Sequence, residues 1–482
     1  MNELPSTPMD APEHPAAPPP LLPRGLLLGV LLIATGMLII VVVGGLEYGW
    51  LAEQPWHAAL VVAGRPVDAD DALPVWIRAV PREKAETGNP FLDELQAGFD
   101  AQNMDITVFP EEQAIMAEVS EDMLAWLTAM GRSPVPGRAE ALAGDLALGT
   151  PFVLDGVTFE VVGRLHQGVS GFPFAYLVPR HPAMAAIFED SPETIEGFLI
   201  EDGLLRLHEL FGEDAAEAAV DFMDDVDAVD DEEAESEALL LGGRARTRLN
   251  FAWAVVAALM ITALGGAIAH ISLFLRWADN APRMLRPVLR AIAAHPALFA
   301  FMHLLLYGLF FAAMAQGVTQ PVLNYRAADY IGSIFTEGGL SYIGDAYASE
   351  EIVRAAAATF FNNYVVQTIG LTFGISIVPL ALGVVKTALS FVMVGFVMAP
   401  VWTGIAAGYS FHSITMVLEL EAYIVACFVV VLWTRRCFRA MYENRVMGEM
   451  RENFALYGSG VVLTGLMLAL AAFYEAATLI LL

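Results

Sequence analysis

The sequence predicts a multi-pass α-helical membrane protein of about seven spans, with one α+β extracytoplasmic domain between spans one and two. The 482 residues are 56% hydrophobic yet carry a formal net charge of −30, which is typical of a membrane part joined to an acidic, solvated part. Residues 360–436 hold three apolar segments in near succession, each able to supply the roughly 20 residues that cross a bilayer. A chain this acidic is not expected to bind nucleic acid or an anionic lipid surface strongly, because both carry negative charge.

The N-terminal region divides into a tail and an anchor. Residues 1–23 contain the run APEHPAAPPPLLP, whose prolines lack the backbone N–H of regular structure, so we expect a disordered Pro-rich tail. Residues 24–47 are the predicted membrane anchor. Their apolar run is roughly twenty residues long and lacks a small-x-small cleavage site, which favours an uncleaved anchor over a signal peptide.

Residues 48–249 form the only sizeable polar block, which is large enough to fold as one α+β extracytoplasmic domain. Asp155-Gly156 predicts a hairpin, because this pair favours a two-residue turn between strands. The other expected elements are strands at 74–80 and 104–109 and helices at 120–130 and 197–211. The block ends in an acidic run at 224–237, which lacks the glycine of an EF-hand loop, so a solvated linker is expected.

Six further spans are predicted to form a helical bundle over residues 250–482. They are expected at 251–275, 297–318, about 364–385, about 387–407, about 415–434 and 458–481. Two of the short loops between them are rich in arginine, namely Arg276, Arg283, Arg286 and Arg290 in one and Arg435, Arg436 and Arg439 in the other.

By the positive-inside rule these two loops are cytoplasmic, which puts the N-terminus inside and residues 48–249 outside. We expect the same arginines to dock a cytoplasmic partner. Arg244, Arg246 and Arg248 do not fit this orientation, because they lie on the predicted outer side of the second span. Long translocated domains largely escape the charge rule, so the other loops decide the orientation.

Polar residues within the apolar segments are the candidate functional residues. They are Asn362, Asn363, Gln367, His412, Glu419 and Glu421. A charge in lipid costs at least about 2.5–3.5 kcal/mol, so such side chains normally face protein or water. His412 and Glu419, seven residues apart, share a helix face, whereas Glu421 points to nearly the other side. The residues either line an interior polar path or form a proton-sensitive latch, or they make buried structural contacts.

Other residues of the bundle are assigned to packing. Gly370 with Gly374, and Gly404 with Gly408, have the four-residue spacing that lets another helix approach closely. His270, His303 and Glu475 stand alone within or near span ends, where packing or interfacial roles are expected.

One stretch of the outer domain carries a recognisable motif. Residues 134–180 read PVPGRAEALAGDLALGTPFVLDGVTFEVVGRLHQGVSGFPFAYLVPR. This stretch resembles the periplasmic core domain of macrolide-exporter-type ABC permeases, in which a PG-x-x-E-x-L-x-G approach precedes a hairpin. The matching residues are Gly137, Glu140, Leu142, Gly144, Gly149, Leu154, Gly156, Phe159, Val161, Val162 and Gly163. The order of anchor, outer domain and further spans is also that of the family.

The membrane half, over about residues 357–436, is similar to the stage II sporulation protein M family. The resemblance rests on FFNNYVVQTIGLTFGI, on the later glycines and on LELEAYIVA. Glu419 matches the glutamate of that family's PHG-x-x-E segment, but Met416 stands three positions before it and no Pro-His-Gly is present. The resemblance implies a multi-pass protein linked to envelope-remodelling complexes and transport machinery, without catalytic chemistry.

These observations predict a non-enzymatic protein of the bacterial inner membrane, a permease-like or scaffold subunit of an ABC-type export or envelope-remodelling complex. The chain has no phosphate-binding loop, no His-Glu-x-x-His helix and no nucleophile elbow, and no cofactor or metal is expected. The expected partners are membrane lipid, a cytoplasmic ATPase, and other membrane subunits or a second copy. One alternative is an intramembrane metal-dependent hydrolase using His412 and Glu419; another is a structural assembly subunit.

Overall fold

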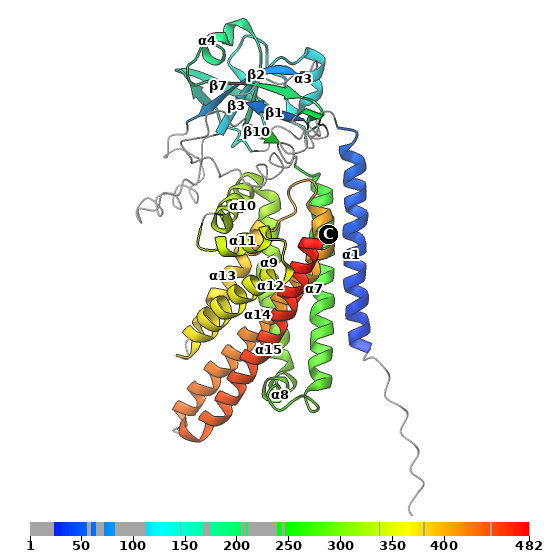
Figure 1. Cartoon of the computed structure of the whole chain (residues 1–482), viewed down its shortest axis with the longest axis vertical. Coiled ribbons are helices and arrows are strands. Elements are labelled where there is room, and N and C mark those ends of the chain that lie inside the picture. Colours follow the sequence, from blue (N-terminus) through cyan, green and yellow to red (C-terminus); the bar gives the residue numbers. More distant parts are fainter. Residues whose placement is uncertain are drawn as a thin grey trace, which may run out of the picture.

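The chain forms a sheet-containing region, here called the sheet domain, at one end of a helical bundle (Figure 1). The computed structural model describes residues 24–54, 59–63, 72–81, 112–144, 146–166, 174–203, 206, 209–210, 239–242, 246–336, 338–378, 381–443 and 446–481. The predicted tail at 1–23, the strand at 104–109 and the acidic run at 224–237 lie outside these residues.

Five helices within the described residues are long and apolar enough to cross a membrane. They are α1 (Arg24–Leu51), α7 (Leu249–Trp277), α9 (Pro296–Thr319), most of α14 (Ile405–Tyr442) and most of α15 (Val446–Leu481). Even the shortest, α9, spans about 36 Å against a hydrocarbon thickness of about 30 Å. A membrane protein with a separate α+β region is confirmed at this level.

The spans expected at 364–385 and 387–407 have the wrong bounds. Helix α12 (Ile352–Phe360) continues as the π-helix η3 (Phe361–Phe373) and the short 3₁₀ helix η4 (Gly374–Ser376). This helical run ends before α13 (Leu382–Val397) begins, and Ala381, the residue directly before α13, has a φ of 53°. Hydropathy gives no sign of this interruption. The sequence signal for it is the proline at 379, because proline cannot continue a helix.

Three shorter helices complete the bundle. They are α8 (Arg286–Ala294), α10 (Pro321–Thr336) and α11 (Ser341–Ala348). In Figure 1, α10 lies close to the sheet domain, whereas α8 and the turn between α14 and α15 lie at the opposite end. The C-terminal end of α15 returns toward the sheet domain.

Ten strands of the sheet domain form one sheet in the order β10-β1-β9-β2-β3-β8-β5-β7-β4, with β6 paired to β7. The strands are β1 (Leu60–Ala63), β2 (Leu73–Val80), β3 (Glu112–Ala117), β4 (Thr128–Gly131), β5 (Glu140–Ala143), β6 (Phe152–Leu154), β7 (Val157–Leu165), β8 (Tyr176–Pro179), β9 (Ile195–Ile200) and β10 (Leu239–Gly242). Both faces are covered: along β3, Ile115 and Ala117 join one apolar cluster, and Ala114 and Met116 join another.

The strands, hairpin and helices predicted for the sheet domain are confirmed in part. The strand expected at 74–80 is β2, and the predicted hairpin is β6 and β7 joined by Asp155 and Gly156. Both turn residues have positive φ, 48° and 78°, as a two-residue hairpin turn requires. The helix expected at 120–130 ends at Leu127, because β4 follows, and α3 (Glu121–Leu127) is its only helical part. The helix expected at 197–211 is wrong at its start, since β9 pairs there with β1 and β2, whereas Glu209 and Leu210 near its end are helical.

Within the described residues of the chain, the predicted glycine pairs make no close contact with another helix. A Cβ on Gly370 or Gly374 would meet carbonyl oxygens of its own helical run, and one on Gly404 or Gly408 would meet nothing within 4 Å. A four-residue spacing defines a helix face but not which way that face turns, so sequence could not choose the right pairs.

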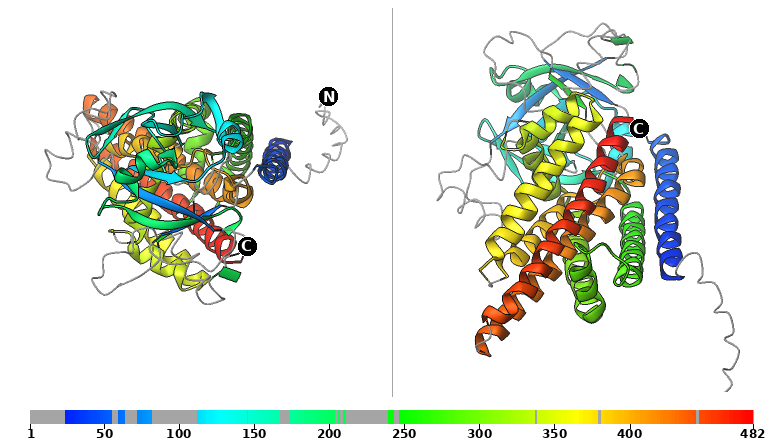
Figure 2. Two further views of the ribbon diagram at one scale, coloured as in Figure 1. Left: turned by 90° about the horizontal axis from the view of Figure 1, so that it is seen from above. Right: turned by 60° about the horizontal axis from the view of Figure 1, so that its bottom comes forward.

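Close helix packing by small residues occurs instead between α1 and α7. A Cβ on Gly29 would lie 2.5 Å from the carbonyl oxygen of Gly265, and one on Gly265 would lie 2.6 Å from that of Gly29. The two backbones therefore touch without side chains between them. Helix α1 stands at the edge of the bundle, against α7 (Figure 2).

Three chain segments are joined where the bundle meets the sheet domain. The Glu47 carboxylate near the end of α1 accepts hydrogen bonds from the Thr247 hydroxyl and from the Gly404 N–H, the latter at 3.2 Å. The Thr247 N–H donates to the Val401 carbonyl at 2.9 Å. The start of α7, the end of α1 and the loop before α14 are therefore held together at one point.

Candidate functional site

Polar side chains are buried at two separate places between the long helices, and both places use a glutamate of α14. Glu419 and Glu421 are two residues apart, about 200° around a helix, so they leave α14 on nearly opposite sides. A carboxyl group among apolar helices is costly unless its oxygens are hydrogen-bonded. Each place is therefore defined by the groups that satisfy its carboxylate.

The Glu421 cluster consists of Glu421, His270 of α7, and His303 and Tyr307 of α9. Glu421 is fully buried. Its Oε2 lies 2.9 Å from Nε2 of His303 and 3.8 Å from Nδ1 of His270. Its Oε1 accepts a hydrogen bond from the Tyr307 hydroxyl at 3.0 Å. His303 and Tyr307 are four residues apart, so adjacent turns of α9 present both to one carboxylate.

One proton is held between His303 and Glu421. Nδ1 of His303 lies 2.8 Å from the carbonyl oxygen of Phe299, which can only accept, so Nδ1 carries a hydrogen. Nε2 faces the carboxylate, and a contact of 2.9 Å there needs a hydrogen on one of the two atoms. The pair is neutral overall whichever group holds that proton, which avoids burying an unpaired charge.

Aromatic rings close off the Glu421 cluster. Phe299 meets the His303 ring edge-to-face with centroids 4.6 Å apart, and Phe428 meets Phe299 at 5.1 Å. Both phenylalanines are fully buried. A layer of packed aromatic side chains excludes water and strengthens the hydrogen bonds that it surrounds.

The Glu419 cluster consists of Glu419, Asn362 and Asn363 of η3, and Glu475 of α15. Asn363 Nδ2 donates to Glu419 Oε1 at 2.7 Å, and Asn362 Nδ2 donates to Asn363 Oδ1 at 2.9 Å. The Asn362 Oδ1 atom is buried and has no hydrogen-bond partner in the described part of the chain. Glu475 is close enough to Glu419 for their charges to interact. A second carboxyl group, from a different helix, therefore lies near Glu419.

The other predicted polar residues lie elsewhere. Gln367 accepts a hydrogen bond from Lys386 of α13. His412 lines a hollow of about 550 Å³ beside Gly45 of α1 and Thr478 of α15. The structure joins Asn362, Asn363 and Glu419 by hydrogen bonds. Glu421 and Gln367 are hydrogen-bonded to other residues, and His412 lines the hollow.

Within the residues that the structure describes, no group of three or more His, Cys, Asp or Glu residues could hold a metal ion. His412 and Glu419, the pair named for a hydrolase, are not joined by any contact of the described residues. Within the described residues, the imidazoles that approach a carboxylate are those of His303 and His270, both beside Glu421.

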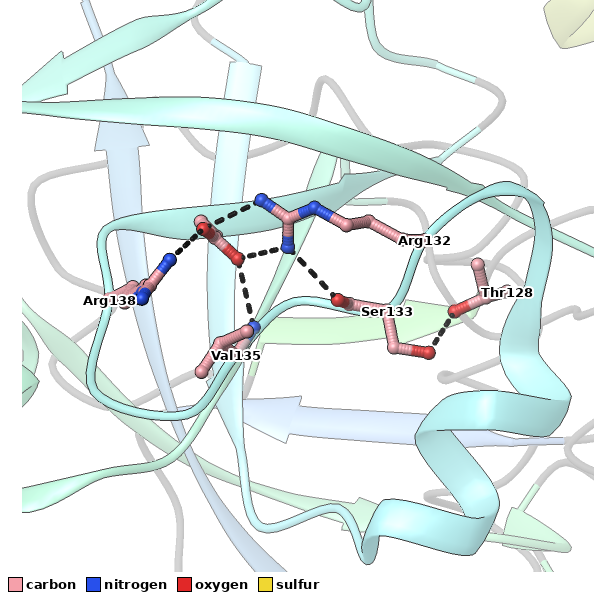
Figure 3. Close-up of polar contacts among 6 residues, drawn as sticks. Thr128, Arg132, Ser133, Val135 and Arg138 are labelled. Atoms are coloured by element: carbon pink, nitrogen blue, oxygen red, sulfur yellow. Dashed lines mark hydrogen bonds and ion pairs between the residues drawn. The ribbon is translucent and has the colours of Figure 1, made fainter.

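The sheet domain has its own buried carboxylate, Glu140. Its partners Arg132, Val135 and Arg138 are labelled in Figure 3. Arg132 donates to its two oxygens at 2.6 and 2.8 Å, and the Val135 N–H donates at 2.9 Å. The Arg132 hydrogen bonds lower the pKa of Glu140 to about 2, although burial opposes them. Gly137 lies within the same loop with a φ of 84°. Two residues of the permease-like motif therefore have structural roles.

The arginines predicted to dock a partner gather at the end of the bundle away from the sheet domain (Figure 1). Arg276, Arg283, Arg290, Arg435 and Arg439 are exposed, and Arg286 and Arg436 are partly buried. Helix α8, which carries two of them, buries Val288, Leu289 and Ile292 against the bundle.

Sequence reasoning missed the residues that satisfy Glu421. His303 and His270 were expected to have packing or interfacial roles, and Tyr307 was not singled out. The available signal was the spacing of His303 and Tyr307, four residues apart in an apolar helix, which puts two hydrogen-bonding groups on one face. Nothing local identified their acceptor, which lies 118 residues from His303 in the chain.

No protein-family model, curated protein or solved structure matches the chain.

Proposed function

We propose that the chain is a non-enzymatic inner-membrane protein, a permease-like or scaffold subunit of an export or envelope-remodelling complex driven by a separate ATPase. The observation that carries the proposal is the path of α7 through the bundle. This helix starts at the junction with the sheet domain and ends beside α8 at the opposite end of the bundle. A single rigid element thus links an outer domain to an arginine-bearing surface, as a subunit that transmits movement across a membrane requires.

The proposed topology has seven spans, an N-terminus inside and residues 48–249 outside. The run from Ile352 to Ser376, 25 residues of continuous helix, supplies one span in addition to the five long helices. Helix α13, about 24 Å long, supplies the other with its flanking residues. Seven crossings alternate so that both arginine-rich loops share the cytoplasmic side.

In this proposal α8 is the docking element. It is short, lies at the cytoplasmic end, holds the bundle through its apolar face and leaves Arg290 exposed. An exposed arginine suits recognition of carboxylates on a partner surface, because its planar donors pair with two oxygens at once. Arg283, just before α8, is also exposed.

The test is co-purification of the tagged full chain from native membranes, comparing the wild type with Arg283→Glu/Arg290→Glu. An ATPase should co-purify with the wild type and be lost from the double variant. Arg354→Glu is the matched control, since Arg354 is an exposed arginine of α12 outside both arginine-rich loops. Absence of an ATPase from the wild-type sample, or its retention by the double variant, would refute the docking role.

The alternative of an intramembrane metal-dependent hydrolase makes a different demand. It needs a metal held by three or four ligands, so the pure wild-type chain would contain a stoichiometric transition metal. Elemental analysis decides this, and we expect no such metal. A metal lost from both His412→Ala and Glu419→Gln would establish the hydrolase instead.

A further inference from the structure

A cavity of about 520 Å³ lies where the long helices meet the sheet domain. Its walls come from the end of α1, from β4 and β7, and from the residues that lead into α7. The residues that matter for its chemistry are Trp50, Arg164, His166, Arg246 and Arg248.

Among the described residues, the cavity is lined by three arginines and by no acidic side chain. This is against the trend of a chain with 55 acidic and 25 basic residues. Arg164 and Arg248 make no ion pair within the described residues. Arg248 contacts rings instead, with its guanidinium 5.4 Å from the centroid of Trp50 and 5.9 Å from that of Phe251. Cationic groups with no carboxylate partner in a concave surface favour an anionic ligand.

The cavity lies at the level where the helices leave the apolar region. Trp50 is the penultimate residue of α1, and Arg248 immediately precedes Leu249, the first residue of α7. Tryptophan and arginine side chains at such helix ends lie among lipid headgroups, since each has an apolar body and a polar tip. The apolar surfaces of α1 and α7 continue from the cavity along the bundle.

We propose that this cavity binds the phosphate of an anionic phospholipid in the leaflet on the sheet-domain side, with Arg164, Arg246 and Arg248 as its cationic ligands. Guanidinium groups match phosphate oxygens in geometry and charge, and the adjacent helix surfaces accommodate acyl chains. The net charge of −30 repels anionic surfaces in general, so a lipid of this class needs a local cationic site. The site also accounts for the basic residues before the second span, which the positive-inside rule leaves unexplained.

The test uses the purified, delipidated full chain in detergent and follows its thermal unfolding by tryptophan fluorescence. Dioleoylphosphatidylglycerol should raise the melting temperature, because a ligand that binds only the folded state stabilises it. Dioleoylphosphatidylcholine and inorganic phosphate at equal concentration should not. Arg164→Gln/Arg248→Gln should raise the half-maximal phosphatidylglycerol concentration about tenfold or more.

Two variants separate lipid binding from folding. Arg354→Gln removes an exposed arginine outside the cavity and should respond as the wild type does. Arg164→Lys/Arg248→Lys keeps both charges, so it should retain more of the response than the glutamine variant. If the glutamine double variant does not fold, the single variant Arg164→Gln on β7 replaces it.

An equal response to phosphatidylcholine, a full response to inorganic phosphate, or an unchanged half-maximal concentration in the glutamine variants would each overturn the proposal. The inference depends on α1 and α7 being in a membrane and not on an ATPase partner. Its test is made on the pure chain, so its failure is distinct from failure of the co-purification experiment.

Discussion

At the scale of single residues, Glu421 shows how a carboxyl group is retained when it is fully buried among long apolar helices. His303, Tyr307 and His270 converge on it from two other helices, and the shared proton keeps its pairing with His303 neutral. The cluster therefore holds three helices in one arrangement. Its partners depend on the carboxylate as much as the carboxylate depends on them, because each would otherwise be a buried polar group without a partner.

Glu421→Ala should lower the stability of the chain by about 3–5 kcal/mol, since it leaves His303 and Tyr307 buried and unpaired. The measurement is thermal unfolding in detergent. The control is Glu443→Ala, whose carboxylate pairs with Arg439 at the exposed end of the same helix and should cost at most about 1 kcal/mol. Equal small effects in the two variants would show that the Glu421 contacts do not stabilise the bundle.

A second residue-scale prediction concerns Glu140 in the sheet domain. Its pKa is about 2 in the folded chain, below the ordinary value of 4.5, chiefly because Arg132 donates to it. The ionised carboxylate therefore stabilises the fold above pH 4.5, and this contribution is lost as the pH falls from 4.5 toward 2. Glu140→Gln should lower the melting temperature of the full chain at pH 6, by a loss of about 1–3 kcal/mol.

The difference between wild type and Glu140→Gln should shrink as the pH is lowered to 3. Glu196→Gln, which removes an exposed carboxylate of β9, should show no such pH-dependent difference. A gap between wild type and Glu140→Gln that stays constant from pH 6 to pH 3 would mean that the ionised form of Glu140 is not what stabilises the loop.

At the scale of elements, the pairing of α1 with α7 rests on backbone contact at small residues. Gly29→Val should destabilise the pair, because a side chain there would enter the backbone of α7, and overpacking costs about 1–3 kcal/mol. Gly45→Val is the matched control on the same helix, where a Cβ would meet nothing within 4 Å. Thermal unfolding of both variants checks this, and equal melting temperatures would contradict the packing.

The elements also show how far sequence reasoning reached. The hairpin at Asp155-Gly156 and the long apolar helices were predicted correctly, because turn chemistry and hydropathy act within a few residues. The helix expected at 197–211 was wrong over its first residues, since β9 is held between β1 and β2, strands more than a hundred residues earlier in the chain. The contact between Glu421 and His303 was beyond prediction for the same reason: it depends on how α9 and α14 pack, and periodicity gives only the face each residue occupies.

At the scale of the whole molecule, the charges are arranged by end. The exposed arginines of α8 and its neighbours lie at the end away from the sheet domain, and the arginines of the proposed lipid site lie at the junction with it. If the first group is cytoplasmic, the second faces the opposite leaflet. Under the two proposals, the orientation of the chain would therefore decide which surface meets the proposed ATPase and which leaflet supplies the proposed lipid.

Cysteine labelling tests that orientation in a chain in which Cys437 is replaced by serine and Cys427 stays buried. Glu196→Cys, which is exposed in the sheet domain, should react with a maleimide that cannot cross the inner membrane. The reaction is run on cells in which only the outer membrane has been permeabilised. Ala293→Cys, exposed on α8, should react only after the inner membrane is opened. Tyr442→Cys, at a position 91% exposed near the turn between α14 and α15, should follow Ala293→Cys, because both lie at the end away from the sheet domain (Figure 1). Labelling of Ala293→Cys and Tyr442→Cys from outside would contradict the proposed topology, whether or not Glu196→Cys is labelled too. It would also contradict the assignment of α8 to a cytoplasmic partner.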